Sequence, residues 1–349
     1  YYIGHVNWTG FNGLMEYTGS EKFSAVLQVG TSSQDYQWEG FYTAAPDTKS
    51  RVVTVNGGYI KGGANYRAND NSNFFFNVGQ IMRPPSFDGV FPNADYDFEE
   101  ADEILNESFT SFELGYGFRS SNFKGTINAY HTVWGDRTLR RSTSIDDQGV
   151  RIIYSGVEQT HQGIEGEMTW YPSSRLRVKG MFSLGDWKYT KNFQGDAYFI
   201  DNNQPAGTTG TLYLDGVKIG DAAQTVLYLG FDYKLTSKLS VDLDMMSYDN
   251  LHGRFGPLDS EFNSANNRGS IKLPSWGTAD LGATYTFNLL GYDARARLNV
   301  NNLFDEEYLS QSQTNFHNDG GRTWNGINVE NNVYFGKGTT WNLGLNINF

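Results

Sequence analysis

Apolar and polar residues alternate strictly along many short stretches of this sequence. The last nine residues show the pattern most simply, because Asn or Gly separates the apolar residues Trp341, Leu343, Leu345, Ile347 and Phe349. Successive side chains of a strand point to opposite faces, so this segment predicts a strand with one apolar and one polar face. The same alternation occurs at residues 22–30, 112–118, 227–235, 239–245 and 293–301.

The connections between the predicted strands fall into two classes of length. Short polar turns occupy 19–22, 69–72, 119–122, 172–175 and 236–238, and long stretches rich in Asp, Asn, Gly and Ser occupy 86–107, 191–221, 251–274 and 305–338. Tight turns at one end and long loops at the other are typical of an outer-membrane barrel. The pattern therefore predicts an all-β fold, a transmembrane antiparallel up-and-down β-barrel. A soluble propeller or sandwich is the less favoured alternative, because those folds do not usually separate their connections by length.

The polar face of the predicted strands supports the barrel. Charged residues stand at alternate positions of three strands, at Glu165, Glu167, Asp242, Asp244, Arg295 and Arg297. A wide, hydrated lumen accommodates such residues while the apolar face meets lipid. Aromatic residues gather near strand ends, as in the girdle of a membrane interface, at Tyr66, Phe118, Trp170, Tyr171, Tyr233 and Phe287.

The number of predicted strands is about thirteen, whereas bacterial single-chain barrels have an even number. With both ends of a barrel chain on the periplasmic side, an odd number indicates that strands precede these. We therefore expect residues 1–349 to form one incomplete domain, the C-terminal portion of a larger barrel.

Composition and charge narrow the function. The mean hydropathy is −0.52, and no apolar run approaches the roughly 20 residues of a membrane-spanning helix. A net charge of −12 argues against a nucleic-acid surface. The sequence has no Cys, no nucleophile elbow, no phosphate-binding glycine loop and no zinc-type spacing of its five His. We expect no enzyme activity, no cofactor and no bound metal.

Several motifs resemble a known family. NVNNLFDEEY at 299–308 and LPSWGTADLGATYTF at 273–287, followed by the final strand, resemble the C-terminal end of TonB-dependent outer-membrane transporters. Further motifs resemble the branch of that family that is common in Bacteroidetes, namely 58–67, the RPPSF at 83–87, 106–119, 213–233 and 248–255. Together these motifs cover nearly all of the chain from about residue 55 onward.

The resemblance implies a barrel of about 22 strands filled by an N-terminal plug. The present residues would supply about the last thirteen strands, and the final strand, Trp341 to Phe349, would close the barrel. The implied function is TonB-dependent uptake of a scarce solute, such as a siderophore, haem, cobalamin, a peptide or an oligosaccharide, across the outer membrane of a Gram-negative bacterium. The implied partners are TonB–ExbB–ExbD through an N-terminal region, outer-membrane lipid and lipopolysaccharide, and other outer-membrane subunits. A structural or docking barrel without transport, or a passive porin, is the alternative.

Candidate ligand contacts lie at strand tops and in loops, where a rigid scaffold positions binding residues. Aromatic side chains together with Arg suit flat or anionic ligands. These candidates are Arg83, Trp134, Arg137, Trp187, Tyr248, Arg254 and Trp324. The alternative is that they form an aromatic girdle and lumenal ion pairs. The acidic stretch at 95–107 and the group Asp305, Glu306 and Glu307 could attract cations, although solvated carboxylates are the commoner interpretation.

Overall fold

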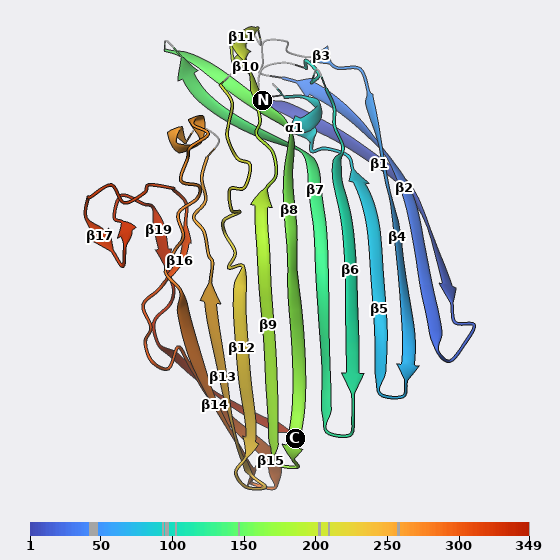
Figure 1. Cartoon of the computed structure of the whole chain (residues 1–349), viewed down its shortest axis with the longest axis vertical. Coiled ribbons are helices and arrows are strands. Elements are labelled where there is room, and N and C mark those ends of the chain that lie inside the picture. Colours follow the sequence, from blue (N-terminus) through green and yellow to red (C-terminus); the bar gives the residue numbers. More distant parts are fainter. Residues whose placement is uncertain are drawn as a thin grey trace.

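The computed structural model describes residues 1–41, 48–92, 94, 98–101, 103–145, 147–201, 204–208, 210–256 and 259–348. These residues form one large, curved antiparallel sheet (Figure 1). Its strands follow the order β1 (Tyr2–Tyr17), β2 (Phe23–Gly40), β4 (Val53–Asn69), β5 (Ser72–Arg83), β6 (Glu107–Arg119), β7 (Phe123–Ile145), β8 (Gln148–Ser173), β9 (Leu176–Tyr189), β12 (Thr225–Lys234), β13 (Leu239–Asp249), β14 (Trp276–Leu289), β15 (Tyr292–Asn301) and β20 (Thr340–Asn348).

Smaller elements lie in the connections. They are β3 (Thr48–Lys49) beside β2, β10 (Gly195–Phe199) beside β8, and β11 (Pro205–Thr208) beside β10. Helix α1 (Phe87–Val90) and the 3-10 helix η1 (Ser260–Asn263) also lie there, with the pairs β16 (Leu309–Ser312) with β19 (Val333–Phe335) and β17 (Thr323–Trp324) with β18 (Ile327–Asn328). No helix in the described ranges is long and apolar enough to cross a membrane.

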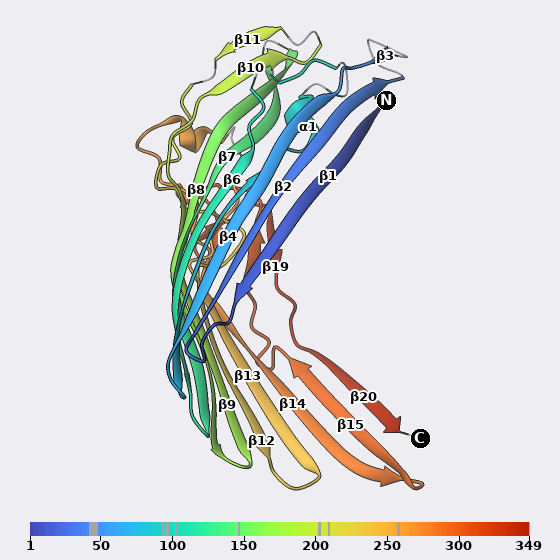
Figure 2. The same cartoon turned by 90° about the vertical axis from the view of Figure 1, so that its right-hand side faces the viewer.

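The sheet is a section of a barrel wall. In the described part of the chain its main path has thirteen strands, which confirms the number expected from the sequence. Figure 2 shows the wall edge-on, with β1 and β20 at the two edges and an open concave side between them. Each edge strand pairs with one neighbour only among the described residues. The closure of a barrel by the final strand therefore stays a prediction.

Short turns and long loops lie at opposite ends of the wall, as expected (Figure 1). We call these the turn end and the loop end. One loop-end connection differs from the pattern of long polar loops, because β7 and β8 continue as a hairpin of 23 and 26 residues. About ten residues suffice to span the membrane, so the hairpin extends the wall well beyond the hydrocarbon.

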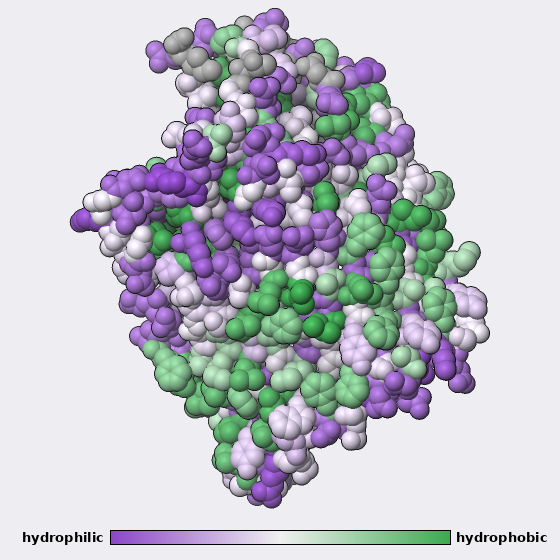
Figure 3. All heavy atoms as spheres, in the orientation of Figure 1, coloured by the Kyte–Doolittle hydropathy of each residue, from purple (hydrophilic) through white to green (hydrophobic). Residues whose placement is uncertain are grey.

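The strand register places most of the alternating apolar residues of the sheet on one face. Leu114 of β6 lies opposite Phe76 and Ala129, and Leu298 of β15 lies opposite Ala283 and Leu343. This is the convex face, and Figure 3 shows a hydrophobic band across it with hydrophilic surface on the loop side. Side chains such as Leu114 are 60% exposed, which a water-facing sheet would not tolerate over so wide an area. The band fits a lipid-facing surface.

The concave face carries a network of polar and charged side chains, as the alternation predicted. The guanidinium of Arg297 donates to both carboxylate oxygens of Asp242, at 2.8 and 2.9 Å. The amine of Lys179 lies 3.2 Å from Asp244, and Arg177 donates to Asp232 at 2.8 Å. Paired charges of this kind suit a hydrated lumen, where neither partner is fully desolvated.

An aromatic girdle surrounds the turn end of the convex face. Tyr66 lies opposite Phe23 and Phe74, and the Phe74 and Tyr116 rings are 5.1 Å apart between centroids. The residues expected there, Tyr66, Phe118, Trp170, Tyr171, Tyr233 and Phe287, all lie at or near the turn end of their strands. Amphipathic rings favour the boundary between lipid and water.

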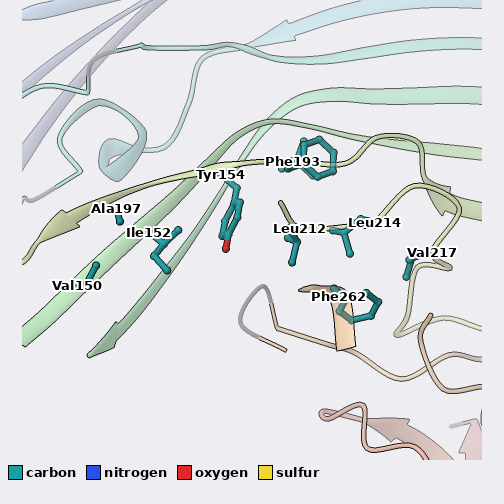
Figure 4. Packing of buried hydrophobic residues seen from close by; sticks show 10 residues of the cluster. Val150, Ile152, Tyr154, Phe193, Ala197, Leu212, Leu214, Val217 and Phe262 are labelled. Carbon is teal, nitrogen blue, oxygen red and sulfur yellow. The ribbon is translucent and has the colours of Figure 1, made fainter. Parts of the chain in front are cut away.

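The loops have hydrophobic cores of their own. The largest packs Phe262 of η1 against Leu212 and Leu214 from the connection after β9, and against Tyr154 of the β7–β8 hairpin. Figure 4 shows these residues converging from segments that are distant in sequence. A second core surrounds Trp38 and Phe91, and a third surrounds Leu251 and Leu273. The described loop segments are therefore packed units and not loose tails.

The final strand presents the apolar face that its sequence predicts. Trp341, Leu343 and Leu345 are 72%, 67% and 60% exposed on the convex side, and Ile347 lies on the same face by its register with Ala294. Phe349 lies outside the described residues. Asn342 lies on the polar face of this strand and accepts a hydrogen bond from Asn299 of β15 at 2.9 Å.

A compact clasp joins β15 to the start of β20. The amide of Asn302 donates to the carbonyl oxygens of Glu306 and Lys337, and Asp305 accepts from the Thr339 amide at 2.8 Å. These contacts explain the structural use of the NVNNLFDEEY motif. Next to them the Tyr308 ring lies flat against Gly336, whose amide donates to the Tyr308 carbonyl oxygen at 2.8 Å.

Replacing Gly336 by Ala should open this clasp. An added Cβ would overlap the Tyr308 ring, so we expect a loss of about 1–3 kcal/mol in local stability and faster proteolysis of the 305–338 loop. Limited proteolysis of the protein in detergent measures this. Gly344→Ala is the matched control, because its Cβ would meet nothing within 4 Å. Equal cleavage rates for both variants would contradict the proposed packing.

Candidate ligand-binding wall

Aromatic and cationic side chains form a continuous surface on the concave face at the loop end. We call it the aromatic–arginine wall, and it consists of Arg83, Phe109, Trp134, Arg137, His161 and Trp187. Strand register brings it together, because Phe109 lies opposite Trp134 across β6 and β7, and His161 lies opposite Trp187 across β8 and β9. The ring centroids are 4.9 and 5.5 Å apart in these two pairs.

A bulge in β7 places Arg137 on this surface. The register against β8 shifts on both sides of Arg137, and Asp136 before it adopts a φ of 56°. The carboxylate of Asp136 accepts from the Ser108 hydroxyl at 2.8 Å, which holds the bulge. Bulges re-aim a side chain and often lie near functional sites. Here the guanidinium carbon of Arg137 lies 3.7 Å from the Trp134 ring centroid, in cation–π contact.

Arg83 reaches the same surface from β5. Its guanidinium pairs with the Glu107 carboxylate and lies 5.6 Å from the Phe109 ring centroid. Glu107 also accepts from the indole nitrogen of Trp134 at 3.3 Å. One carboxylate thus orients an Arg and a Trp together. The side-chain nitrogen Nε of Arg137 is buried and has no hydrogen-bond partner in the described structure, so this cation retains an unused donor.

Trp187 is held rigidly. Its indole nitrogen donates to the Tyr130 hydroxyl at 2.9 Å, and its backbone amide donates to the side chain of Gln224 at 2.9 Å. Gln224 is 1% exposed and donates in turn to the Trp187 and Ile219 carbonyl oxygens. The facing Nε2 atom of His161 is buried without a hydrogen-bond partner in the described structure. A fixed indole beside the unpaired ring nitrogen of His161 would bind a flat ligand without losing side-chain freedom.

A second aromatic group lies two strands away on the same concave face. Tyr248 of β13 stacks on Trp276 of β14 with a centroid distance of 4.0 Å, and Trp276 stacks on Tyr308 at 3.7 Å. Tyr308 lies in the clasp after β15, where its carbonyl oxygen accepts from the Gly336 amide. The stack therefore connects the concave face of the sheet to the 305–338 loop.

The structure brings together four of the seven residues that the sequence suggested, namely Arg83, Trp134, Arg137 and Trp187. Tyr248 belongs to the neighbouring stack. Arg254 lies in a loop, where its guanidinium donates to Asp221 at 2.7 Å. Trp324 packs on Phe335 within the loop after β15, with centroids 5.2 Å apart. The role of all seven in binding a ligand stays a prediction.

Sequence reasoning missed Phe109, His161, Trp276 and Tyr308. The sequence held a signal for Phe109. This residue lies on the polar face of a strand whose other face carries Phe112 and Leu114. A wall that contacts a ligand requires aromatic residues on the lumenal face near the loop end. The partners of such a residue could not be identified without the register.

The described parts of the two acidic stretches hold no metal-binding cluster. No group of three or more His, Asp or Glu lies close enough to hold a metal ion among the described residues. In the stretch at 95–107, residues 95–97 and 102 lie outside the described ranges, and Glu100 pairs with Arg51. Asp305 belongs to the clasp.

A network of ion pairs joins the 251–274 loop to the 305–338 loop. Arg268 donates to Glu261 at 2.7 Å and also pairs with Asp319 of the loop after β15. The Arg268 guanidinium is the main cause that lowers the pKa of Glu261 to about 2. Because the folded pKa is depressed, the stabilisation is fully present above the ordinary value near 4.5 and is lost as the pH falls from there towards 2.

Acidification should therefore release these loops before the barrel wall. We expect the 251–274 and 305–338 loops to lose hydrogen-exchange protection as the pH decreases from about 4.5 to about 2. In Glu261→Gln the protection should be lower at neutral pH and should change less over this range. Exchange measured by mass spectrometry after correction for the intrinsic rate tests this. A steep pH dependence that persists in Glu261→Gln would assign it to another group.

The fold defines the wall of a membrane β-barrel, and its lumenal face carries the aromatic–arginine wall at the loop end. The family model described as "TonB dependent receptor-like, beta-barrel" matches residues 14–303, so the chain belongs to that family. Barrels of this family are proteins of the Gram-negative outer membrane, which confirms the expected location. The family consists of receptors and transporters, which supports the expectation of no enzyme activity.

Solved structures share the fold at low sequence identity. The siderophore receptor PiuA from Acinetobacter baumannii matches with a TM-score of 0.69 and 15% identity, over 99% of this chain and 43% of that one. The copper transporter OprC matches with a TM-score of 0.64 and 13% identity, over 98% of this chain and 48% of that one. The ferric-catecholate import receptor Fiu from E. coli K12 matches with a TM-score of 0.62 and 16% identity, over 100% of this chain and 45% of that one.

The chain thus spans less than half the length of these structures. A search of curated proteins gave no match. The likeness to the branch common in Bacteroidetes is not tested by these matches and stays a prediction.

Proposed function

We propose that this chain forms part of the wall of a transporter that takes up a scarce solute by TonB-dependent transport. Membership of the family supports this, and so does the division of the wall into a lipid-facing convex surface and a charged concave surface. The observation that carries the proposal is the aromatic–arginine wall, because it presents aromatic rings and cations at the lumenal loop end, where an external solute would arrive.

The chemistry of the wall favours an anionic, flat solute. Trp134 and Trp187 offer ring surfaces, and Arg137 has a buried donor that finds no partner among the described residues. Arg binds carboxylates and similar planar anions in two-point contacts and also stacks on rings. A ferric siderophore or haem satisfies these groups better than a neutral oligosaccharide does. PiuA and Fiu, whose fold is similar, are described as a siderophore receptor and a ferric-catecholate import receptor.

In the proposed mechanism the chain performs no chemistry on the solute. The packed loops around η1 and β16–β19 admit it, and the aromatic–arginine wall holds it at the top of the lumen. Work delivered by TonB–ExbB–ExbD through an N-terminal plug then opens a path along the charged concave face. Side chains such as Lys179 and Arg297, already paired with carboxylates, keep that path hydrated.

Uptake by cells that produce the protein tests the function. We expect labelled ferric siderophores or haem to accumulate only when TonB is present, because the energy must come from the inner membrane. Accumulation that is equal without TonB would support a passive porin. If no solute of the panel accumulates and the protein co-purifies with other outer-membrane proteins, the docking alternative is supported.

Arg137→Ala should weaken binding of the solute by about tenfold, since a partly desolvated cation contributes on the order of 1–2 kcal/mol. Arg137→Lys should recover only part of the affinity, because an amine lacks the planar fork. Arg119→Ala, at the turn end of β6, is the control. Affinity is measured with the protein in detergent by quenching of tryptophan fluorescence. Equal affinities of Arg137→Ala and the control would remove Arg137 from the site.

A further inference from the structure

Two arginines flank the rings of the aromatic–arginine wall, and a carboxylate neutralises only one of them. Arg83 belongs to β5, Phe109 to β6 and Arg137 to β7, and these strands are neighbours in the sheet (Figure 1). Two strand spacings, about 10 Å, separate β5 from β7. The aromatic–arginine wall therefore has two cationic positions, and a flat solute of about that width would reach both of them.

Glu107 neutralises the cationic position at Arg83. Its carboxylate oxygen Oε2 pairs with the Arg83 guanidinium and also accepts from the indole nitrogen of Trp134 at 3.3 Å. The Glu107 side chain is 21% exposed, whereas that of Arg83 is 58% exposed. Because two partners hold Glu107, its negative charge has a fixed place beside the rings. A solute that lies against Phe109 meets a cation and an anion there, with no net charge between them.

Arg137 remains available to an anionic group of a solute. Its guanidinium carbon lies 3.7 Å from the Trp134 ring centroid, and its Nε atom is buried without a hydrogen-bond partner among the described residues. Burial is the main cause that lowers the pKa of Arg137, whereas the paired charges of Glu107 and Arg83 shift it in opposite directions. The Glu107–Arg83 pair therefore leaves the charge of Arg137 uncompensated.

We propose that Glu107 determines which anionic solutes this surface accepts. The inference rests on the proposed function and concerns its specificity. A flat solute whose anionic groups share one edge can turn that edge to Arg137 and its uncharged edge to Glu107. A solute with anionic groups on opposite edges must bring one of them against the Glu107 carboxylate, since Arg83 is already paired. Repulsion between like charges then excludes the second kind of solute.

The preferred class is thus a flat ring system with its carboxylates gathered at one edge. The planar guanidinium of Arg137 suits such carboxylates and also stacks on rings. A purely structural Glu107 predicts a different result, because a residue that only holds the Trp134 ring in place would affect all flat solutes alike. The ratio of two affinities therefore distinguishes the two roles better than either affinity alone.

Two isomeric probes test the proposal with the protein extracted from outer membranes. Naphthalene-2,3-dicarboxylate has both carboxylates on one edge, and naphthalene-2,6-dicarboxylate has them on opposite edges, with equal ring area and charge. We expect the wild type to bind the first isomer about tenfold more tightly, the usual effect of one charged contact. In Glu107→Gln the second isomer should gain about tenfold, because Arg83 becomes free to bind it. Affinity for the first isomer should change little. Isothermal titration calorimetry measures both affinities.

Two further variants serve as controls. Glu113 lies on the same face of β6 and accepts from Asn77 at 2.9 Å and from Asn128 at 3.0 Å. Glu113→Gln removes an equivalent charge away from the rings and should keep the wild-type preference. In Arg83→Ala/Glu107→Gln the gain for the second isomer should disappear, because its partner is removed. The change in electrophoretic mobility on heating verifies that each variant is folded.

The proposal is overturned if Glu107→Gln changes the affinities for both isomers by the same factor, or if the wild type does not distinguish the isomers. Neither result bears on TonB-dependent uptake, which is measured separately in cells. Uptake that is equal without TonB, together with the expected isomer preference, would remove the proposed function and leave the role of Glu107 intact.

Discussion

The constraint on which this structure depends is the absence of water from the lipid interior. A backbone amide or carbonyl group in hydrocarbon must find its partner within the protein, which leaves a continuous antiparallel ladder as the way for strands to cross. The ladder also fixes side chains, because a slip of one residue would exchange the two faces. Leu298, between Ala283 and Leu343, illustrates how the apolar phase is kept from strand to strand.

Departures from the regular ladder occur where water is available again. The bulge that turns Arg137 onto Trp134 lies in the part of β7 beyond the apolar band. The hairpin of β7 and β8 carries the wall further outward, where β10 joins its edge and the loop cores pack against it. The aromatic–arginine wall is therefore built from strands that are longer than the membrane requires. The positions of these lumenal side chains are therefore fixed by a hydrogen-bonded sheet and not by a loop.

The two faces of the strands and the two ends of the barrel wall give the side chains four different environments. The outward face meets lipid, with aromatic rings at the turn end and polar side chains such as Gln162 and Asp186 towards the loop end. The inward phase carries ion pairs such as Arg297 with Asp242 along the lumen, and aromatic rings near the loops. Each environment is determined by the solvent at that position, whether acyl chains, headgroups, lumenal water or ligand.

The sequence by itself determined the strands, their two faces, the division into turns and loops, and the family. These features are local, since a period of two and a cluster of turn residues can be read within about ten positions. It also indicated Arg83, Trp134, Arg137 and Trp187 as aromatic and cationic residues of strand tops. Only the tertiary structure decided which of these meet, because Phe109 and Trp134 become neighbours through a register set by many hydrogen bonds. Arg254 and Trp324 lie elsewhere because the loops fold around cores of their own. Isolated bridges likewise pair Lys188 with Lys218 and His252 with Lys272, and such non-local contacts leave no periodic trace along the chain.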